Sequence, residues 1–454
     1  MNEHLSEGQR QQRLPKPSLN VIRRPIDLLQ PDPANARVHT KKQIRQIARS
    51  IQVYDFCVPL LIDADLRVIA GHGRLLAARQ LGLPDVPTIS LKHLTPVQAK
   101  AFSITDNRLT EIATWDDRLL GEQLRGLSEL DLNFSLDVTG FEIGEIDLLI
   151  EGAAPQADPA DEVPRPQPGP PVCRPGDLWQ LGPHRIYCGN AIEEDAYRVL
   201  MGEDRAAAVF TDPPYNVPID GHASGLGAIH HREFAMASGE MDQGAFTQFL
   251  AQACGLLAGF SRDGSLHYLC MDWRHLRELL DAAQPVYSEW KNLCVWAKDN
   301  AGMGSLYRSQ HELVLVFKKG RGRHRNNVQL GKHGRDRSNL WSYPGARSLS
   351  RTSDEGNLLA MHPTVKPVRL VADALLDSTA RGDIVLDGFL GSGTTLLAAE
   401  RVGRVCRGLE IDPLYVDTAI RRWQAHTGED TVNVGTGCSF DETAAAETQV
   451  EGEP

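Results

Sequence analysis

The feature that most constrains the fold is a strand, glycine turn, helix and strand in direct succession. Residues 384–412 read IVLDGFLGSGTTLLAAERVGRVCRGLEID. IVLDGF is a short apolar run that suits a buried strand, TTLLAAERVG has helical composition and ends in glycine, and VCRGLEI resumes a strand pattern. This succession predicts a βαβ unit in a parallel sheet, with a ligand bound beyond the carboxyl ends of the strands, at the glycine turn.

The composition of this turn restricts the ligand. A triphosphate-binding loop needs Gly-Lys-Ser/Thr, whereas Gly393 is followed by two threonines, and the third glycine of a dinucleotide fingerprint is missing. Glu410 ends the second strand, where it can accept hydrogen bonds from both hydroxyls of a ribose. The unit therefore predicts a nucleoside without a pyrophosphate, and S-adenosylmethionine fits this description. A glycine turn that serves only the sheet is the alternative.

A second motif, TDPPYN, occupies residues 211–216 and follows the apolar run AAAVF. Two successive prolines remove two N–H donors, so the backbone carbonyls and the Asp212 carboxylate present acceptors with little competing donor. A planar amino group, which carries two N–H donors, matches such a surface, and Tyr215 offers a flat face for a base. A Pro-Pro turn after a strand is the alternative without chemistry.

DPPY followed downstream by FLGSGTT at 389–395 resembles the amino-group DNA methyltransferases whose catalytic motif precedes the cofactor motif, the beta group. Further similar stretches are GDLWQLGPHRIYCGNA at 176–191 and HPTVKP at 362–367. The resemblance covers about 177–425. It implies an α/β fold with a Rossmann-like, mostly parallel seven-stranded methyltransferase sheet. The chain departs from the family pattern at Gly388, where proline is usual, and at Asn190, where aspartate is frequent.

By this resemblance the family's functional residues carry over to this chain. Asp212 and the Pro213 carbonyl accept the two N–H groups of adenine N6, which then attacks the sulfonium methyl group of S-adenosylmethionine in line, near a carboxylate and without a metal. The base must be flipped out of the duplex, with Tyr215 as its stacking platform. The catalytic residues are Asp212, Pro213, Pro214 and Tyr215, and the cofactor-binding residues are Asp387, Phe389, Gly391, Ser392, Gly393, Thr394, Thr395, Glu410, Asp412, Lys366 and Pro367.

The charge distribution points to a DNA-facing segment. The whole chain has 48 basic and 59 acidic residues, a net charge of -11, which speaks against wholesale binding of nucleic acid. Residues 318–337, however, hold eight Lys or Arg against one Asp. We interpret 318–351 as part of the DNA-facing surface, since phosphates need clustered cations; a solvated basic loop is the alternative. The DNA-binding candidates are Lys318, Lys319, Arg321, Arg323, Arg325, Lys332, Arg335 and Arg337. For His311 and Glu312 we expect a structural role.

The N-terminal region has its own pattern. TKKQIRQIARSI at 40–51 places Ile44, Ile47, Ala48 and Ile51 on one helix face. Strand, turn with helix, and strand patterns follow, and the region resembles the ParB-like nuclease fold, a smaller α+β domain. The resemblance implies an accessory nucleotide site at a helix N-terminus, although Leu75 replaces the second arginine common in partition proteins. Its candidates are Gly71, His72, Gly73, Arg74, Asn107 and Arg108. A degenerate accessory module is the alternative.

These patterns divide the chain into four segments. We expect a ParB-like domain at 20–151, a Pro-rich linker at 152–176 with eight prolines in 25 residues, the methyltransferase domain at 177–425, and an acidic, disordered tail at 426–454. The sequence has neither a signal-peptide core nor an apolar run of membrane-spanning length, so we expect a cytoplasmic protein without a membrane partner.

The leading hypothesis is a site-specific DNA adenine-N6 methyltransferase that binds double-stranded DNA, of the type found in restriction-modification systems. Cytosine-N4 transfer uses the same geometry, more often with serine at the position of Asp212. A ParB-like DNA- or nucleotide-binding protein with a vestigial methyltransferase domain is the alternative of another class. Methylation of RNA or of a protein glutamine is disfavoured by the motif order. The recognised site, a cognate restriction enzyme and the choice between monomer and homodimer stay open.

Overall fold

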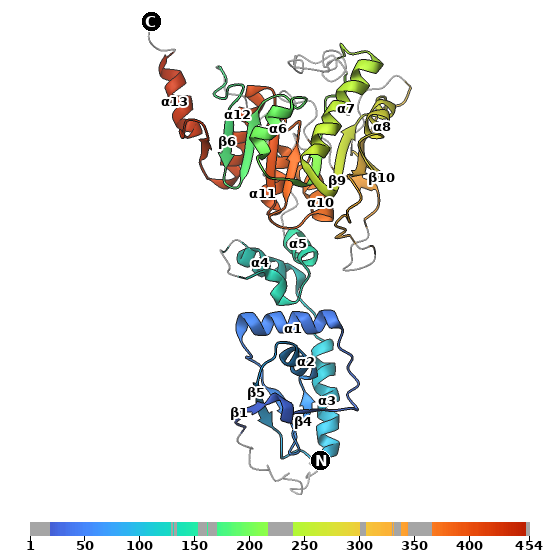
Figure 1. The fold of residues 1–454 in the computed structure, drawn as a ribbon, viewed down its shortest axis with the longest axis vertical. Helices are drawn as coiled ribbons and strands as arrows, with labels where there is room; N and C mark the ends of the chain where they lie inside the picture. Colours follow the sequence, from blue (N-terminus) through green and yellow to red (C-terminus); the bar gives the residue numbers. More distant parts are fainter. Residues whose placement is uncertain are drawn as a thin grey trace, which may run out of the picture. The chain divides into compact units, whose positions relative to one another are not determined.

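The computed structural model describes residues 19–128, 130, 134–152, 161, 170–216, 239–299, 306–328, 330, 337–343 and 366–450. The chain divides into two units, Met1–Ala154 and Pro155–Pro454, each with its own sheet (Figure 1). Among the described residues, none of the helices has the length and apolar character required to cross a membrane.

The first unit is an α+β domain around a five-stranded mixed sheet of order β1-β5-β3-β4-β2. Its elements are β1 (Val21–Pro25), η1 (Ile26–Leu28), β2 (Gln30–Pro31), α1 (Lys41–Tyr54), β3 (Leu60–Ile62), β4 (Arg67–Ala70), α2 (His72–Gln80), β5 (Asp85–Ser90), α3 (Pro96–Glu111), α4 (Asp117–Ser128), η2 (Leu136–Thr139) and α5 (Ile143–Gly152). Leu60, Ile62, Val68, Leu75 and Val86 form the core of this sheet, and a second small core joins α4 to α5.

Helix α1 carries the predicted amphipathic pattern. Thr40 caps its first turn by accepting a hydrogen bond from the Gln43 N–H at 3.1 Å, and Ala48 is buried on its apolar face. The polar face pairs with the segment around η2: Arg49 bonds Asp137, and Lys42 contacts Glu142. The last part of the first unit is therefore joined to α1 by charge as well as by chain continuity.

The second unit is built on a ten-stranded sheet of order β12-β10-β11-β9-β8-β13-β14-β7-β6-β15 among the described residues. Its elements are β6 (Leu178–Leu181), β7 (His184–Cys188), α6 (Glu194–Met201), β8 (Ala206–Thr211), α7 (Gln243–Gly259), β9 (Ser261–Met271), α8 (Leu276–Ala283), β10 (Glu289–Ala297), β11 (His311–Lys318), β12 (Leu340–Ser342), α10 (Val368–Ser378), β13 (Ile384–Asp387), α11 (Thr394–Arg401), β14 (Val405–Glu410), α12 (Pro413–Thr427), β15 (Thr431–Asn433) and α13 (Phe440–Val450).

This sheet confirms the predicted α/β class and extends the predicted strand number. Seven contiguous strands, from β10 to β7 in the sheet order, form a mostly parallel centre in which β11 alone runs antiparallel to its two neighbours, β9 and β10. β12 adds to one edge, and β6 and β15 add to the other, so the expected seven strands become ten. The predicted strand-turn-helix-strand unit is β13, α11 and β14, with β13 and β14 parallel.

Helices cover both faces of the sheet, which explains why its central strands read as continuous apolar runs. Alternate residues of one strand enter different cores: Phe210 packs with α10, α11 and α12, whereas Val209 packs with α6, α7 and α8. β8, which lies at the centre, is buried at every position. In Figure 1, α6 and α7 lie in front of the sheet in green, and α11 and α12 lie behind it in red.

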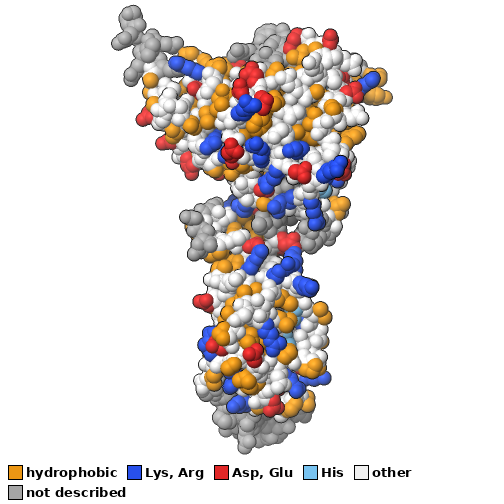
Figure 2. All heavy atoms as spheres, viewed as in Figure 1, with side chains coloured by type: hydrophobic (Ala, Val, Ile, Leu, Met, Phe, Trp, Pro, Cys, Tyr) orange, Lys and Arg blue, Asp and Glu red, His pale blue; other side chains and the backbone are white. Residues whose placement is uncertain are grey.

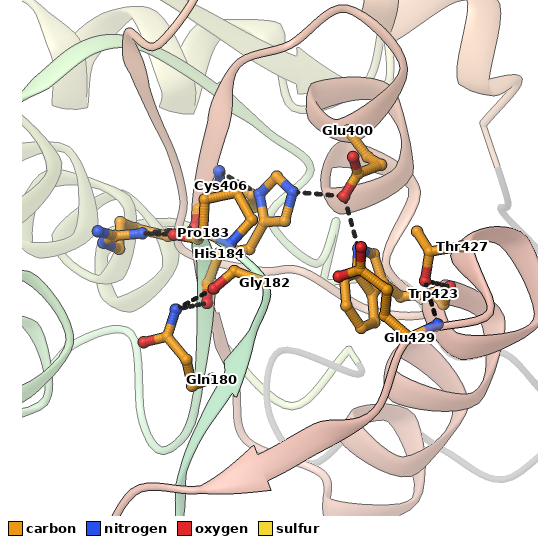
Figure 3. A network of polar contacts seen from close by, with 10 residues as sticks. Gln180, Gly182, Pro183, His184, Glu400, Cys406, Trp423, Thr427 and Glu429 are labelled. Atoms are coloured by element: carbon orange, nitrogen blue, oxygen red, sulfur yellow. Dashed lines mark hydrogen bonds and ion pairs between the residues drawn. The ribbon is translucent and has the colours of Figure 1, made fainter. Parts of the chain in front are cut away.

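A buried histidine connects two strands and two helices of the second unit through hydrogen bonds (Figure 3). His184 on β7 accepts a hydrogen bond from the Cys406 N–H at 2.8 Å through Nδ1, so its proton is on Nε2, which donates to Glu400 at 2.9 Å. The Trp423 indole donates to the same Glu400 oxygen at 2.8 Å. The hydrogen bond from His184 lowers the pKa of Glu400. This network ties β7, β14, α11 and α12 together behind the glycine turn.

The structure corrects both predicted flexible segments where it describes them. Val172 and Cys173, expected in the linker, are buried and donate their N–H groups to Asp417 at 2.9 Å each, so the second unit begins before residue 176. The expected disordered tail contains β15, which pairs with β6, and α13, whose Phe440 is buried against Trp179. The acidic composition of this segment did not indicate order, because the segment is held to the second unit by strand pairing and by the burial of Phe440. Residues 153–160, 162–169 and 451–454 lie outside the described residues.

We predict that Phe440→Ala destabilises the second unit by about 3–5 kcal/mol, because it removes a fully buried ring and leaves a cavity beside Trp179. Chemical denaturation measures the loss. Cys438→Ser, in the same segment but exposed, is the matched control and is expected to change stability by less than about 0.5 kcal/mol. Equal stability of both variants would show that this segment does not contribute to the core.

Candidate active site

The two predicted motifs meet because their strands are neighbours. β8 and β13 pair in parallel, with Val209 opposite Leu386, so both strands end at the same edge of the sheet. The Thr211 hydroxyl, at the end of β8, donates a hydrogen bond of 2.7 Å to the Asp387 carboxylate at the end of β13. The turn that follows each strand therefore opens into one pocket.

This pocket has about 1050 Å³ of empty space, including its open mouth. Its walls come from the DPPY turn, the glycine turn and the end of β14. The predicted residues that line it are Asp212, Pro213, Pro214, Tyr215, Lys366, Asp387, Phe389, Gly391, Ser392, Thr394, Thr395, Glu410 and Asp412. Gly393 and Pro367 are not among its lining residues. The neighbouring Gly189 and Ala191 line it, while Asn190 turns to Glu193 at 3.2 Å.

The glycine turn needs its glycines for two different reasons. Gly391 has φ +54 and donates its N–H to Glu410 at 2.8 Å, whereas Gly393 has φ +88 at the start of α11. A Cβ atom on Gly393 would lie 2.8 Å from the Cβ of Ala419 on α12. The second glycine therefore permits α12 to approach the turn. Pro367, which was also predicted to bind the cofactor, is the N-cap residue of α10.

The Glu410 carboxylate faces the pocket and is held by the backbone, and its contact with a ribose stays a prediction. Its two carboxylate oxygens accept one backbone N–H each, from Gly391 at 2.8 Å and from Asp412 at 2.9 Å. A carboxylate oxygen accepts more than one hydrogen bond, so each oxygen keeps a lone pair for the pocket. Burial raises the pKa of Glu410 to about 7.

The chemistry of the walls fits a cationic nucleoside without a pyrophosphate. Among the described lining residues, Lys366 is the sole Lys or Arg, and its ammonium group is held by two carboxylates, so the pocket offers no phosphate clamp. Four carboxylates line it instead, which suits the positive charge of a sulfonium. Two of the predicted cofactor residues also hold the turn: Asp387 accepts the Phe389 N–H at 3.0 Å, and Ser392 is bound by Arg422.

The catalytic turn lies in a buried network of charges. Lys366 bonds the Asp212 carboxylate and lies 2.8 Å from Glu312. The Tyr215 hydroxyl lies 2.5 Å from the other oxygen of Asp212 and 2.7 Å from Glu312. Lys298 completes the network at 3.0 Å from the second oxygen of Glu312. The structure thus brings Lys366 to the Asp212 carboxylate.

Burial and pairing shift the ionisation of this network in opposite directions. Burial raises the pKa of Asp212. Burial also opposes ionisation of Glu312, but Lys366 and Lys298 outweigh it and lower the pKa of Glu312 to about 2. Desolvation disfavours the Lys366 ammonium, yet the two carboxylates outweigh it and raise the pKa of this lysine. Asp212, Glu312 and Cys270 together have the spacing of metal ligands, and the two ammonium groups of Lys366 and Lys298 balance the two carboxylates.

The structure places the described basic candidates away from this pocket. β11 runs antiparallel to β9, with Leu313 opposite Met271 at the pocket end and Lys318 opposite Leu266 toward the other end. Lys319 donates to the Ser261 carbonyl at 2.5 Å, at the start of β9. Lys318, Lys319, Arg321, Arg323 and Arg325 therefore lie beyond the amino ends of the parallel strands, and the structure does not bring them to the mouth of the pocket. Their contact with DNA stays a prediction, and Lys332 and Arg335 lie outside the described residues.

Arg337 differs from the other basic candidates because it is bound within the protein. It pairs with Asp373 at 3.2 Å and Asp377 at 2.9 Å on α10, and these carboxylates help to raise its pKa although burial opposes them. We therefore assign Arg337 a structural role. On the face shown in Figure 2, basic and acidic side chains are interspersed over both units, without a continuous acidic area.

The accessory site in the first unit is assembled in part. Gly71, with φ +100, is the N-cap residue of α2, and burial lowers the pKa of both His72 and Arg74. The Asp32 N–H donates to His72 at 3.2 Å, and the Arg74 Nε has no hydrogen-bond partner among the described residues. Gly73 is buried in α2 against His39. Asn107 accepts from Arg37 at 3.0 Å, while Arg108 pairs with Glu111 at the surface. Nucleotide binding here stays a prediction.

Sequence reasoning did not connect Glu312 and Lys298 to Asp212, whereas the structure joins both to its charge network without placing them among the residues that line the pocket. The structural role that we expected for Glu312 stays a prediction. A signal existed: Glu312 opens the apolar strand HELVLVF, and a charged residue at the buried end of such a strand needs a partner.

Comparison with known proteins assigns the family. Residues 206–421 match the DNA methylase family model for N6 and N4 enzymes, and residues 118–175 match the ParB-methyltransferase HTH domain. The ParB-like nuclease domain-containing protein YnaK of Escherichia coli is 41% identical over 80 residues, 18% of this chain and 92% of YnaK. The chain thus contains an N6/N4 DNA methylase domain and a ParB-like domain. Use of S-adenosylmethionine, the predicted cofactor, follows from the methylase domain.

Two further relatives match the methyltransferase region. The Type II methyltransferase M2.MboI of Moraxella bovis is 24% identical over 253 residues, 53% of this chain and 88% of that protein. The crystal structure of the M1.HpyAVI-SAM complex is 21% identical, covering 52% of this chain and 98% of that one, with a TM-score of 0.37. The HTH match spans α4 and α5 and overlaps the predicted linker, a module that the sequence reading did not separate.

We predict that S-adenosylmethionine binds about tenfold more tightly at pH 8 than at pH 6, because the Glu410 carboxylate must be ionised to accept both ribose hydroxyls and its pKa is about 7. Isothermal titration calorimetry across this range measures the dependence. Glu410→Gln keeps the shape but cannot ionise, so its weaker binding should lose the pH dependence centred near 7. A wild-type affinity independent of pH would contradict this role of Glu410.

Proposed function

We propose that the protein is a site-specific DNA methyltransferase that transfers a methyl group to the exocyclic N6 amino group of adenine in double-stranded DNA, in the cytoplasm. The observation that carries the proposal is the Asp212 carboxylate, which lies at the end of β8, beside two prolines, in the same pocket as Glu410 and the glycine turn. An acceptor for an amino group and a site for the methyl donor thus share one cavity.

Different residues of this pocket are proposed to bind the cofactor and the target base. Glu410 and the turn around Gly391 are proposed to hold the nucleoside part of S-adenosylmethionine, which supplies the methyl group when bound. Asp212 and the Pro213 carbonyl accept the two amino N–H groups of the target base, which turns the nitrogen lone pair toward the donor. The positive charge that develops on this nitrogen lies beside the Asp212 carboxylate, which stabilises it.

The base has to leave the duplex to reach Asp212, because its amino group is paired inside the helix. We assign Tyr215 as the surface on which the flipped base stacks. Its hydroxyl is fixed by Asp212 and Glu312, so the ring is held in one orientation in the pocket wall. A fixed ring lowers the entropic cost of orienting the base.

Cytosine N4 is the second candidate, because its amino group presents the same two donors to the same acceptors. Asp212 favours adenine by resemblance to the family, in which the cytosine enzymes more often carry serine at this position. The alternative, in which the ParB-like domain carries the function and the methyltransferase domain is vestigial, has less support. Residues of both the DPPY motif and the glycine turn line one pocket.

Labelled product analysis decides between the bases. We expect that incubation with isotopically labelled S-adenosylmethionine and unmethylated DNA, followed by digestion to nucleosides and mass spectrometry, gives label in N6-methyladenine. Label in N4-methylcytosine would keep the fold and the mechanism but overturn the adenine assignment. Absence of label from DNA, despite cofactor binding, would overturn the proposed function.

We predict that Asp212→Ala lowers the rate of methyl transfer by on the order of 10³-fold, because the developing positive charge and one amino N–H lose their acceptor. Cofactor binding, measured by calorimetry, should persist. Asp281→Ala removes an exposed carboxylate from α8, with its side chain 56% exposed, and serves as the matched control with activity near that of the wild type. Full activity of Asp212→Ala would contradict the assignment of Asp212.

A further inference from the structure

The groups that bind the catalytic carboxylate occupy the positions that a substrate needs. Lys366 bonds one oxygen of Asp212, and the Tyr215 hydroxyl bonds the other. An ammonium group and an exocyclic amino group are both N–H donors, so the two compete for the same acceptor. Lys366 is 5% exposed at its side chain and cannot leave for water without opening the wall of the pocket.

Glu312 offers Lys366 a second partner at the same place. One oxygen of Glu312 lies 2.8 Å from the Lys366 ammonium, and the other lies 3.0 Å from Lys298. Lys366 can therefore give up Asp212 and stay paired with a carboxylate. This matters because a buried charge without a partner is strongly destabilising, whereas a charge that exchanges one buried partner for another stays compensated.

We propose that Lys366 takes the place of the target amino group on Asp212 until the base arrives, and that Glu312 is the positioning residue that retains Lys366 when the base displaces it. This inference rests on the proposed function and goes beyond it in assigning roles to two residues. In the resting site the ammonium neutralises Asp212. During the reaction the positive charge that develops on the substrate replaces the ammonium beside the same carboxylate.

The arrangement also explains why Glu312 has two cationic neighbours. The network holds two carboxylates and two ammonium groups, so its formal charges cancel. When Lys366 moves away from Asp212, Glu312 is bound by two lysines, and the freed Asp212 faces the substrate. The Tyr215 hydroxyl lies within hydrogen-bonding distance of both carboxylates, and its single proton is donated to one of them at a time.

The competing role for Lys366 is direct contact with the cofactor, as the family resemblance implies. The described contacts of its ammonium group are with Asp212 and Glu312, at the DPPY side of the pocket, whereas Glu410 ends β14, which β13 separates from β8 in the sheet. The two roles differ in a measurable way, because a cofactor ligand affects binding of the methyl donor, whereas a substitute for the amino group affects Asp212.

The ionisation of Asp212 reports on this arrangement. Methyl transfer requires the carboxylate, so the rate rises as the pH rises through the pKa of Asp212, which gives the acid limb of the pH profile. Several titratable and charged groups face Asp212 from the elements packed around it. They are Tyr215 in the same turn, Cys270 on β9, Glu312 on β11, Lys366 before α10 and Asp387 at the end of β13. Lys298, which follows β10, pairs with Glu312.

Two substitutions with opposite expected shifts test the proposal. Lys366→Met removes the cation that lowers the pKa of Asp212, so the acid limb of kcat should move to higher pH. Glu312→Gln removes an anion that raises this pKa, so the limb should move to lower pH. Shifts of about 1–3 pH units are expected for unit charges at such distances. With Glu312→Gln, Lys366 also binds Asp212 without a competitor, so kcat should fall and KM for DNA should rise.

Controls separate charge from folding. Lys366→Arg keeps the cation and should return the limb toward the wild-type position. Lys298→Met removes a cation that pairs with Glu312 and lies over the Trp296 ring, so it should shift the limb less than Lys366→Met does. Cofactor affinity and thermal unfolding are measured for every variant. Unshifted limbs, shifts in the same direction, or a specific loss of cofactor binding by Lys366→Met would overturn the inference. A wild-type protein that transfers no methyl group would instead overturn the proposed function.

Discussion

The pairing of β8 with β13 is the constraint on which the site depends. The two strands are separated by more than 170 residues in sequence, yet their parallel register brings Thr211 and Asp387 within hydrogen-bonding distance. A parallel sheet places the carboxyl ends of its strands at one edge, and every turn that follows such a strand opens there. The DPPY turn supplies acceptors, and the glycine turn with Glu410 supplies the cofactor side. Neither turn forms a pocket alone, so the chemistry is a property of the sheet order.

Compensation of charge is the second condition for this site. A pocket for a sulfonium and a developing ammonium benefits from carboxylates, but four carboxylates in a buried space repel each other and resist ionisation. The structure meets this conflict differently at each position. Glu410 receives two backbone N–H groups, Asp387 receives the Thr211 hydroxyl and the Phe389 N–H, and Asp212 receives Lys366 and Tyr215. In the proposed mechanism, displacement of Lys366 makes the Asp212 carboxylate accessible to the substrate.

Much of this architecture could be predicted from local sequence. The strand, turn and helix pattern around Gly393 is confirmed as β13, α11 and β14, because each piece has its own period and a glycine marks the turn. The edges of the sheet could not be predicted, since β12 and β15 have three residues each and follow no period. The tail was misjudged for the same reason: the acidic composition suggested disorder, and the burial of Phe440 depends on a partner, Trp179, more than 250 residues away.

Contacts between charged residues that are distant in the sequence could not be predicted from local patterns. The motif located Asp212, but the partners of Asp212 lie on β11 and before α10, and no local pattern connects Glu312 to Lys366. The basic run at 318–337 had the composition of a DNA-binding surface, yet the antiparallel direction of β11 carries its described part to the edge opposite the pocket. Reversing one strand in a parallel sheet thus has two effects. It brings Glu312, at the beginning of β11, to the catalytic carboxylate, and it removes the cations at the end of β11 from the pocket.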